Sequence, residues 1–254
     1  MRVFSKQGFC LLFVFFMGSA FVSPRLWALN YKTLEPGLDY AELAVQNEAK
    51  STLHILRIDL KKFNVKPIEA RDYSATSLSV KTMSEKSGAL AVLNANFFDP
   101  QRKALGLILK DGVVKNSFKN ISWWGVFLLN KSYAKIAKLS QEAEAKGFEQ
   151  GVQAGPRLVV KGSPMKLKSE FSAKSAIGLD AKNRVYLIAS QGSVEINELA
   201  KFLAKSLKSG GLGLTDALNL DGGSSTQFFV KRGEFQRWVP AFATVPVGLG
   251  VFRR

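Results

Sequence analysis

Residues 218–226 read Leu-Asn-Leu-Asp-Gly-Gly-Ser-Ser-Thr, so that one carboxylate, two glycines and three hydroxyls follow an apolar run. The two leucines alternate with polar neighbours, as in the last residues of a buried strand. The glycines allow positive φ and let the backbone approach a ligand closely. The hydroxyls and N–H groups of such a loop can bind an anion, with Asp221 fixed beside it at the strand end. An Asp-Gly pair is also common in plain tight turns, so this stretch alone leaves that alternative open.

Four earlier blocks also place polar residues or glycines at the ends of apolar runs. They read Ala-Val-Leu-Asn-Ala-Asn-Phe-Phe-Asp at 91–99, Leu-Gly-Leu-Ile-Leu-Lys-Asp-Gly at 105–112, Gly-Pro-Arg-Leu-Val at 155–159 and Lys-Ser-Ala-Ile-Gly at 174–178. In order, and closing on the Asn-Leu-Asp-Gly-Gly stretch, the five blocks resemble those of the phosphodiester glycosidase family. The resemblance covers roughly residues 53–252.

Two positions depart from the family's pattern. Asn94-Ala95-Asn96 replaces an asparagine followed by two glycines, and asparagine also tolerates a left-handed backbone. Lys174 stands where the family usually has arginine. A lysine keeps the charge but loses the planar, two-pronged contact with a phosphate or carboxylate. The lysine motivates an alternative function, a non-catalytic envelope module that binds phosphorylated glycan.

The resemblance implies a hydrolase that cleaves the glycosidic bond of a sugar-1-phosphodiester. The transition state gathers positive charge on the sugar and negative charge on the phosphate, so the site needs a carboxylate and cationic or N–H donors. Asp221 is the first candidate for the catalytic carboxylate and Asp99 the second, although Asp99 precedes Pro100 and could simply start a turn. The residues expected to bind substrate are Asn94, Asn96, Arg157, Lys174, Ser175, Gly222, Gly223, Ser224 and Ser225.

No cofactor or metal is predicted. The chain has one histidine, His54, and one cysteine, Cys10, too few for a zinc site built on His and Cys ligands. It lacks a phosphate-binding Gly-x-x-x-x-Gly-Lys-Ser/Thr loop and a dinucleotide-binding glycine pattern after a strand. His54 lies among apolar residues of a predicted strand, where a structural histidine is the usual case.

The first 28 residues have the pattern of a secretory signal peptide. Arg2 and Lys6 precede a charge-free, largely apolar run at 8–22, and Ala28 suits the last position before cleavage. The run has fifteen residues, short of the roughly twenty that span a bilayer, although an uncleaved anchor remains an alternative. We therefore expect a periplasmic or secreted protein that acts on an envelope or extracellular glycan.

The net charge of +16 favours anionic partners. The basic residues are mostly scattered lysines rather than one dense block, so a specific nucleic-acid partner is not predicted. A phosphorylated glycan or glycoconjugate is the expected substrate, with peripheral contact to anionic envelope surfaces. A basic surface with no specific partner remains the alternative.

The remaining patterns predict one α+β domain at 29–254, with a mainly antiparallel sheet and a few packed helices, because strands and hairpins outnumber helices. Helices are expected at 77–86, at the Glu-, Ala- and Lys-rich stretch 140–150, and at 195–208, where apolar residues recur with helical spacing. Residues 29–50 are expected to be irregular, with a short edge strand at most.

Overall fold

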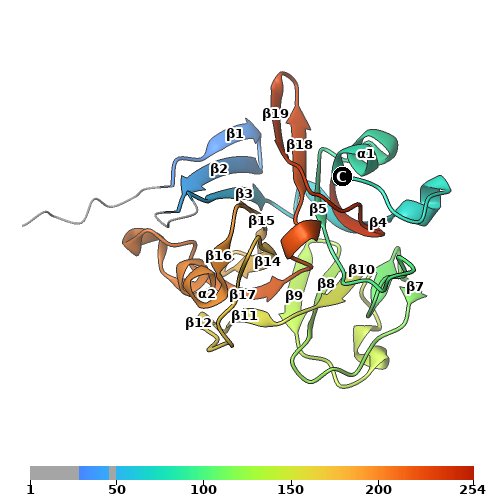
Figure 1. Ribbon diagram of the computed structural model, residues 1–254. Helices are drawn as coiled ribbons and strands as arrows, with labels where there is room; N and C mark the ends of the chain where they lie inside the picture. The colour runs from blue at the N-terminus through green and yellow to red at the C-terminus, as the bar shows by residue number, and fades with distance from the viewer. Residues whose placement is uncertain (1–28, 46–49) are drawn as a thin grey trace, which may run out of the picture.

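The computed structural model describes residues 29–45 and 50–254, and the predicted signal peptide lies outside the described residues. A large sheet spans the molecule (Figure 1), and every strand pair within it is antiparallel. Its strands, in spatial order, are β1 (Lys32–Glu35), β2 (Leu38–Ala44), β3 (Thr52–Ile58), β15 (Val185–Gln191), β14 (Ser175–Asp180), β17 (Leu214–Asn219), β11 (Arg157–Val160) and β12 (Ser163–Pro164).

Two five-stranded antiparallel sheets pack on one face of the large sheet. One contains β7 (Val113–Asn116), β6 (Ile108–Lys110), β10 (Gln150–Ala154), β8 (Gly125–Asn130) and β9 (Tyr133–Ala137). The other contains β19 (Phe235–Val239), β18 (Phe228–Arg232), β5 (Ala91–Asn94), β20 (Val247–Arg253) and β4 (Phe63–Glu69). A short pair, β13 (Phe171–Ser172) with β16 (Val194–Glu195), lies apart from these sheets. Side chains from all three large sheets form one central core.

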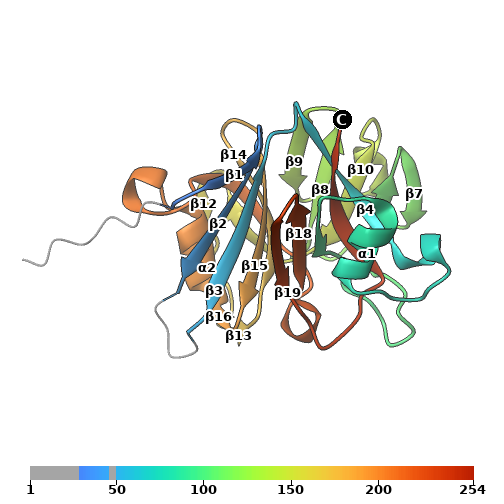
Figure 2. The same ribbon diagram turned by 90° about the horizontal axis from the view of Figure 1, so that it is seen from above.

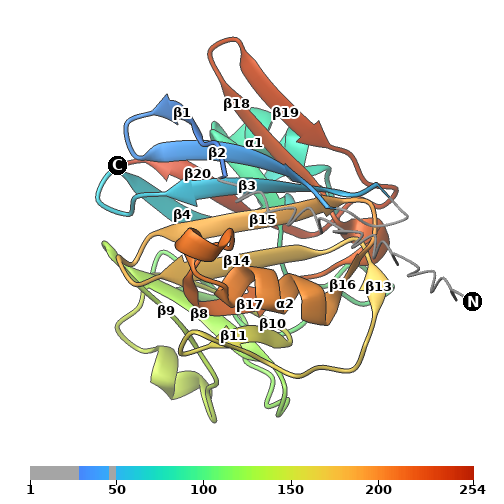
Figure 3. The ribbon, with the colours of Figure 1, turned by 90° about the vertical axis from the view of Figure 1, so that its left-hand side faces the viewer.

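The central strands of the large sheet, such as β14 and β15, are buried on both faces, which explains their continuous apolar runs. Along β15, Val185 and Leu187 point into the central core, whereas Tyr186 and Ile188 pack on the opposite face. Because successive side chains point to opposite sides of a strand, both faces need apolar residues. The helix α2 (Ile196–Ala204) covers that second face, as seen in Figure 3 where it lies in front of β14 and β17.

The second helix, α1 (Val80–Ser87), covers the outer face of the sheet that contains β5 and β20 (Figure 2). It lies largely within the expected stretch 77–86 and begins after Ser79, whose side chain accepts a hydrogen bond from the Thr82 N–H. The expected helix at 195–208 is also confirmed in part, because it ends at Ala204 and continues as a 3₁₀ turn. No helix in the described part of the chain is long and apolar enough to cross a membrane.

The predicted α+β class is wrong, because the fold is mainly β, with α1 and α2 the only α-helices among the described residues. The stretch 140–150 forms only one 3₁₀ turn, η2 (Glu142–Ala145). Gly147 then takes φ +87° and Gln150 already begins β10. Pairing of β10 between two neighbouring strands thus overrides the local helix propensity.

Residues 29–45, the described part of the stretch 29–50 that was expected to be irregular, are also more regular than predicted. They contain β1 and β2, which form a hairpin through Gly37 at φ +91°. The expected edge strand is β1, which is the first strand of the large sheet. The sequence analysis predicted too little strand here, because charged residues are as common in an exposed edge strand as in a loop.

Candidate functional site

The backbone of Asp221 lies where the large sheet meets β5. Directly after β17, the Asp221 N–H donates to the Ala95 carbonyl at 2.9 Å. The Asn94 Nδ2 in turn donates to the Asp221 carbonyl at 2.6 Å. The following 3₁₀ turn, η4 (Gly223–Ser225), lies at the centre of the view in Figure 1. Two segments far apart in sequence therefore fix the position of this carboxylate.

Asn94 is fully occupied by contacts within the protein. It is buried, and its Oδ1 accepts hydrogen bonds from the Ser175 hydroxyl at 2.6 Å and from the Gln227 N–H at 3.1 Å. With its bond to Asp221, this one side chain joins β5, β14 and the two ends of the loop 221–227. Asn94 and Ser175 therefore position the Asp221 loop.

The Asp221 carboxyl group is only half-exposed. Burial raises its pKa to about 6, while hydrogen bonds from the Ser225 side chain and the Gly222 N–H act in the opposite direction. The Gly222 N–H lies 3.0 Å from Asp221 Oδ1. A carboxyl group that titrates near neutral pH can act as an acid or a base in catalysis.

The loop after Asp221 packs against the segment that leads into β14. The Gly223 N–H donates to the Ala173 carbonyl at 2.8 Å, and Gly223 takes φ +58°. A Cβ on Gly222 would lie 2.9 Å from the same carbonyl, so the contact needs glycine. Ser225 is buried, whereas Ser224 is exposed and its hydroxyl is available to a ligand.

Lys174 lies beside this loop, but its charge is already paired. The side chain is buried, and its Nζ donates to Glu170 Oε1 at 2.6 Å and to Ser172 Oγ at 2.8 Å. The hydrogen bond from Lys174 lowers the pKa of Glu170. The sequence prediction missed Glu170 and Ser172, although positions 170, 172 and 174 are each two residues apart, the spacing that places side chains on one face of an extended segment.

Arg157 is the candidate phosphate ligand with an unpaired charge. It is half-buried at the start of β11, where it pairs with Leu218. Its side chain packs against Gly125, where a Cβ would lie 2.8 Å from Arg157 Cγ. Within residues 29–45 and 50–254, its guanidinium group makes no hydrogen bond or ion pair. This cation is therefore free to bind an anion near the end of β17.

Asp99 and Asn96 are each held by hydrogen bonds within the protein. The Asp99 carboxylate accepts the Lys103 N–H at 2.8 Å and closes a turn of the chain, and no hydrogen bond joins it to Asp221. The Asn96 Nδ2 donates to the carbonyls of Leu105, Leu107 and Gln153. Asp99 therefore stabilises a turn, and Asn96 holds neighbouring loops together.

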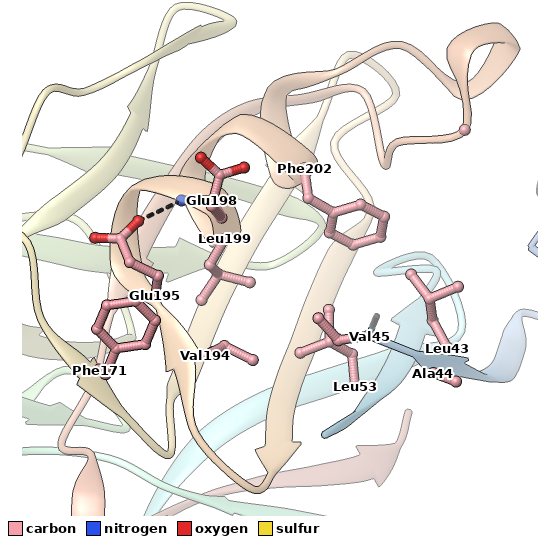
Figure 4. Close-up of a pocket in the computed structure, with 11 residues that line it drawn as sticks. Leu43, Ala44, Val45, Leu53, Phe171, Val194, Glu195, Glu198, Leu199 and Phe202 are labelled. Carbon is pink, nitrogen blue, oxygen red and sulfur yellow. Dashed lines mark hydrogen bonds between the residues drawn. The ribbon is translucent and has the colours of Figure 1, made fainter. Parts of the chain in front are cut away.

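A pocket of about 640 Å³ opens elsewhere, between α2, the ends of β2 and β3, and the short pair β13–β16 (Figure 4). Its walls are mostly apolar, with Glu195 and Glu198 on one side. None of the predicted site residues lines it. Among the described residues, no group of three or more His, Cys, Asp or Glu side chains forms a candidate metal site.

Comparison with known proteins confirms the resemblance seen in the sequence. The family model for phosphodiester glycosidases matches residues 87–252. The catalytic domain of zebrafish N-acetylglucosamine-1-phosphodiester alpha-N-acetylglucosaminidase, auto-inhibited by its pro-peptide, superposes with a TM-score of 0.66 at 18% identity, over 89% of this chain and 87% of that one.

A hypothetical protein from Synechocystis has the same fold, with a TM-score of 0.73 at 15% identity over 89% of this chain. The chain spans 64% of the length of that protein. No curated protein gives a significant match by sequence comparison. The structural similarities establish a shared fold, and the family match covers all five sequence blocks in full.

Proposed function

This chain belongs to the phosphodiester glycosidase family, and on that premise we propose that it is an enzyme that hydrolyses the glycosidic bond of a sugar-1-phosphodiester. The observation that carries the proposal is the half-buried Asp221 carboxyl group, whose pKa burial raises to about 6. It stands on a glycine loop after β17, the strand that pairs with β11, where Arg157 is the first residue. A site that combines this carboxylate with that cation would match the opposite charges that develop on sugar and phosphate.

In this proposal Asp221 acts at the anomeric carbon. Above about pH 6 the carboxyl group is ionised, and it can stabilise positive charge on the sugar ring or accept a proton from the attacking water. The phosphomonoester is a good leaving group, so its departure needs charge stabilisation more than protonation. Arg157 and the exposed Ser224 hydroxyl supply donors for that phosphate.

The other predicted residues support this arrangement in different ways. Asn94 and Ser175 hold the backbone of Asp221, and Gly222 and Gly223 give the loop its close contact with Ala173. Direct substrate contacts from Asn94, Asn96 and Ser175 stay a prediction, as do a second catalytic role for Asp99 and phosphate binding by Lys174, which would need to leave Glu170. Export to the envelope and a glycan substrate there are also proposals, supported by the N-terminal pattern and the net charge of +16.

The test uses the 4-nitrophenyl diester of a sugar 1-phosphate. Cleavage at the sugar side releases a reducing sugar and 4-nitrophenyl phosphate, which becomes coloured only after a phosphatase is added. Cleavage at the other ester bond releases 4-nitrophenol directly. In ¹⁸O-labelled water the label should appear in the hydroxyl group on the anomeric carbon of the sugar. The variant Asp221→Asn should lose activity at least a hundredfold. Label on the phosphate, or an Asp221→Asn variant as active as wild type, would rule out the proposed chemistry.

The alternative function is a non-catalytic module that binds phosphorylated glycan, and the pairing of Lys174 with Glu170 favours it. In that case purified protein binds the diester without releasing either product. The variant Lys174→Arg separates the two functions further. A large gain in hydrolysis would indicate a binding module that has lost catalytic activity. Unchanged hydrolysis would indicate an active enzyme that functions with lysine at this position.

A further inference from the structure

A row of three aromatic side chains lies beside the Asp221 loop, and no step of the proposed hydrolysis uses it. The ring centres of Phe97 and Trp124 are 5.3 Å apart, and those of Trp124 and Trp123 are 5.8 Å apart at an angle of 86°. Phe97 is half-buried and Trp124 buried, whereas Trp123 is 54% exposed. The row therefore runs from the protein interior to a solvent-facing indole.

Two independent contacts place this row next to Asp221. On one side, the Asp221 N–H bonds to the carbonyl of Ala95, two residues before Phe97. On the other side, both indoles pack on Gly155, whose carbonyl accepts the Asn219 Nδ2 at 3.0 Å. Asn219 is two residues before Asp221, so the row borders the carboxylate loop from two directions.

The inner side of the outer indole packs on Gly155 and Trp124. A Cβ on Gly155 would lie 2.9 Å from Trp124 Cδ1 and 3.2 Å from Trp123 Cε3, so the absence of a side chain there makes room for both rings. The backbone N–H of Trp124 donates a hydrogen bond to the Ile121 carbonyl at 3.1 Å, and this bond fixes the turn before β8. An exposed aromatic ring fixed in this way binds a ligand with little loss of conformational entropy.

Several buried polar atoms around the row lack hydrogen-bond partners among the described residues. They are Asn96 Oδ1, Trp124 Nε1, Asn219 Oδ1 and Thr226 Oγ1. Such atoms are uncommon in folded proteins, and each calls for a functional or solvent explanation. Their gathering around the Asp221 loop, next to an exposed indole, is typical of a site that a polar ligand or water completes.

We propose that Trp123 is a stacking platform for a pyranose ring of the substrate. One face of a pyranose presents mainly C–H bonds, which pack on the electron-rich face of an indole. The Arg157 side chain packs against Gly125, the residue after Trp124, so a phosphate bound there would belong to the same ligand. The inference rests on the proposed function, and it adds that the substrate is recognised through its sugar ring as well as through its phosphate.

The test measures binding in the Asp221→Asn background, which holds ligand without turnover, by calorimetry and by tryptophan fluorescence. The two probes are the phenyl diester of a hexopyranose 1-phosphate and the sugar-free methyl phenyl phosphate. Trp123→Ala should weaken binding of the glycosyl diester about tenfold and leave the sugar-free diester within twofold. Trp123→Phe should retain most of the affinity, which separates a stacking role from a general loss of fold.

The matched control is Trp238→Ala, because Trp238 is 46% exposed on the hairpin β18–β19, which projects away from β8 (Figures 1 and 3). It should leave binding of both probes within twofold. Equal affinity of Trp123→Ala and its parent for the glycosyl diester overturns the inference, as does a parent that binds neither diester. If the parent binds the glycosyl diester through Trp123 while the wild type fails to hydrolyse it, the inference holds and the proposed function fails.

Discussion

Replacing Asp221 by asparagine should stabilise the protein at alkaline pH while it removes the proposed activity. Burial raises the pKa of Asp221 from 3.8 to about 6. The folded state therefore favours the protonated carboxyl group, and that contribution is complete below about pH 4 and lost as the pH rises through about 6. Asparagine is neutral at every pH, and its amide oxygen can still accept the Gly222 N–H.

A shift of about two pKa units corresponds to about 3 kcal/mol, since each unit is worth about 1.4 kcal/mol. At pH 8 the wild type carries the full cost of the ionised carboxylate, so Asp221→Asn should gain up to about 3 kcal/mol, or roughly 6–12 °C in melting temperature. At pH 4 the wild-type carboxyl is protonated, and the difference should fall below about 1 kcal/mol.

Thermal unfolding of both proteins across pH 4–8, followed by circular dichroism, measures this difference. Asp99→Asn is the matched control, because its carboxylate lies in a turn, where a substitution should change stability by less than about 0.5 kcal/mol. A melting temperature of Asp221→Asn that stays equal to the wild type at pH 8, or a gain of equal size at pH 4, would refute the claim that burial perturbs this carboxyl group.

Three further variants and conditions test the rest of the site. Asn94→Ala should lower the free energy of unfolding by about 2–4 kcal/mol in urea titrations, because it leaves the buried Asp221 carbonyl and Gln227 N–H unpaired; a loss under 1 kcal/mol would contradict its bracing role. Arg157→Ala should raise KM for the glycosyl diester about tenfold or more, with Arg157→Lys recovering part of the loss, and unchanged KM would assign the phosphate to another residue. The wild-type kcat/KM should fall about tenfold per pH unit below about 6 as Asp221 becomes protonated, and a flat profile between pH 4 and 8 would exclude an ionised Asp221 from the rate-determining chemistry.

The sequence was informative wherever the signal is local. Apolar runs, glycine turns and helical patterns identified most strands and both helices, because such patterns depend on neighbouring residues. The excess of helix in the prediction came from 140–150, whose composition favours a helix. In that stretch the pairing of β10 with its neighbouring strands outweighs the local helix propensity, and no local sequence pattern indicates this pairing.

For the candidate site, the sequence by itself selected the family and the carboxylate loop, since residue types and their spacing are written in the chain. Only the tertiary structure decided how those residues are used. It uses Asn94 to hold the Asp221 loop and pairs Lys174 with Glu170. Among the residues that the structure describes, it gives the Arg157 guanidinium group no partner, and it brings Trp123 next to the loop. The physical reason is that hydrogen bonds, burial and charge pairing depend on which distant segments meet, and strand register between separate sheets fixes those meetings.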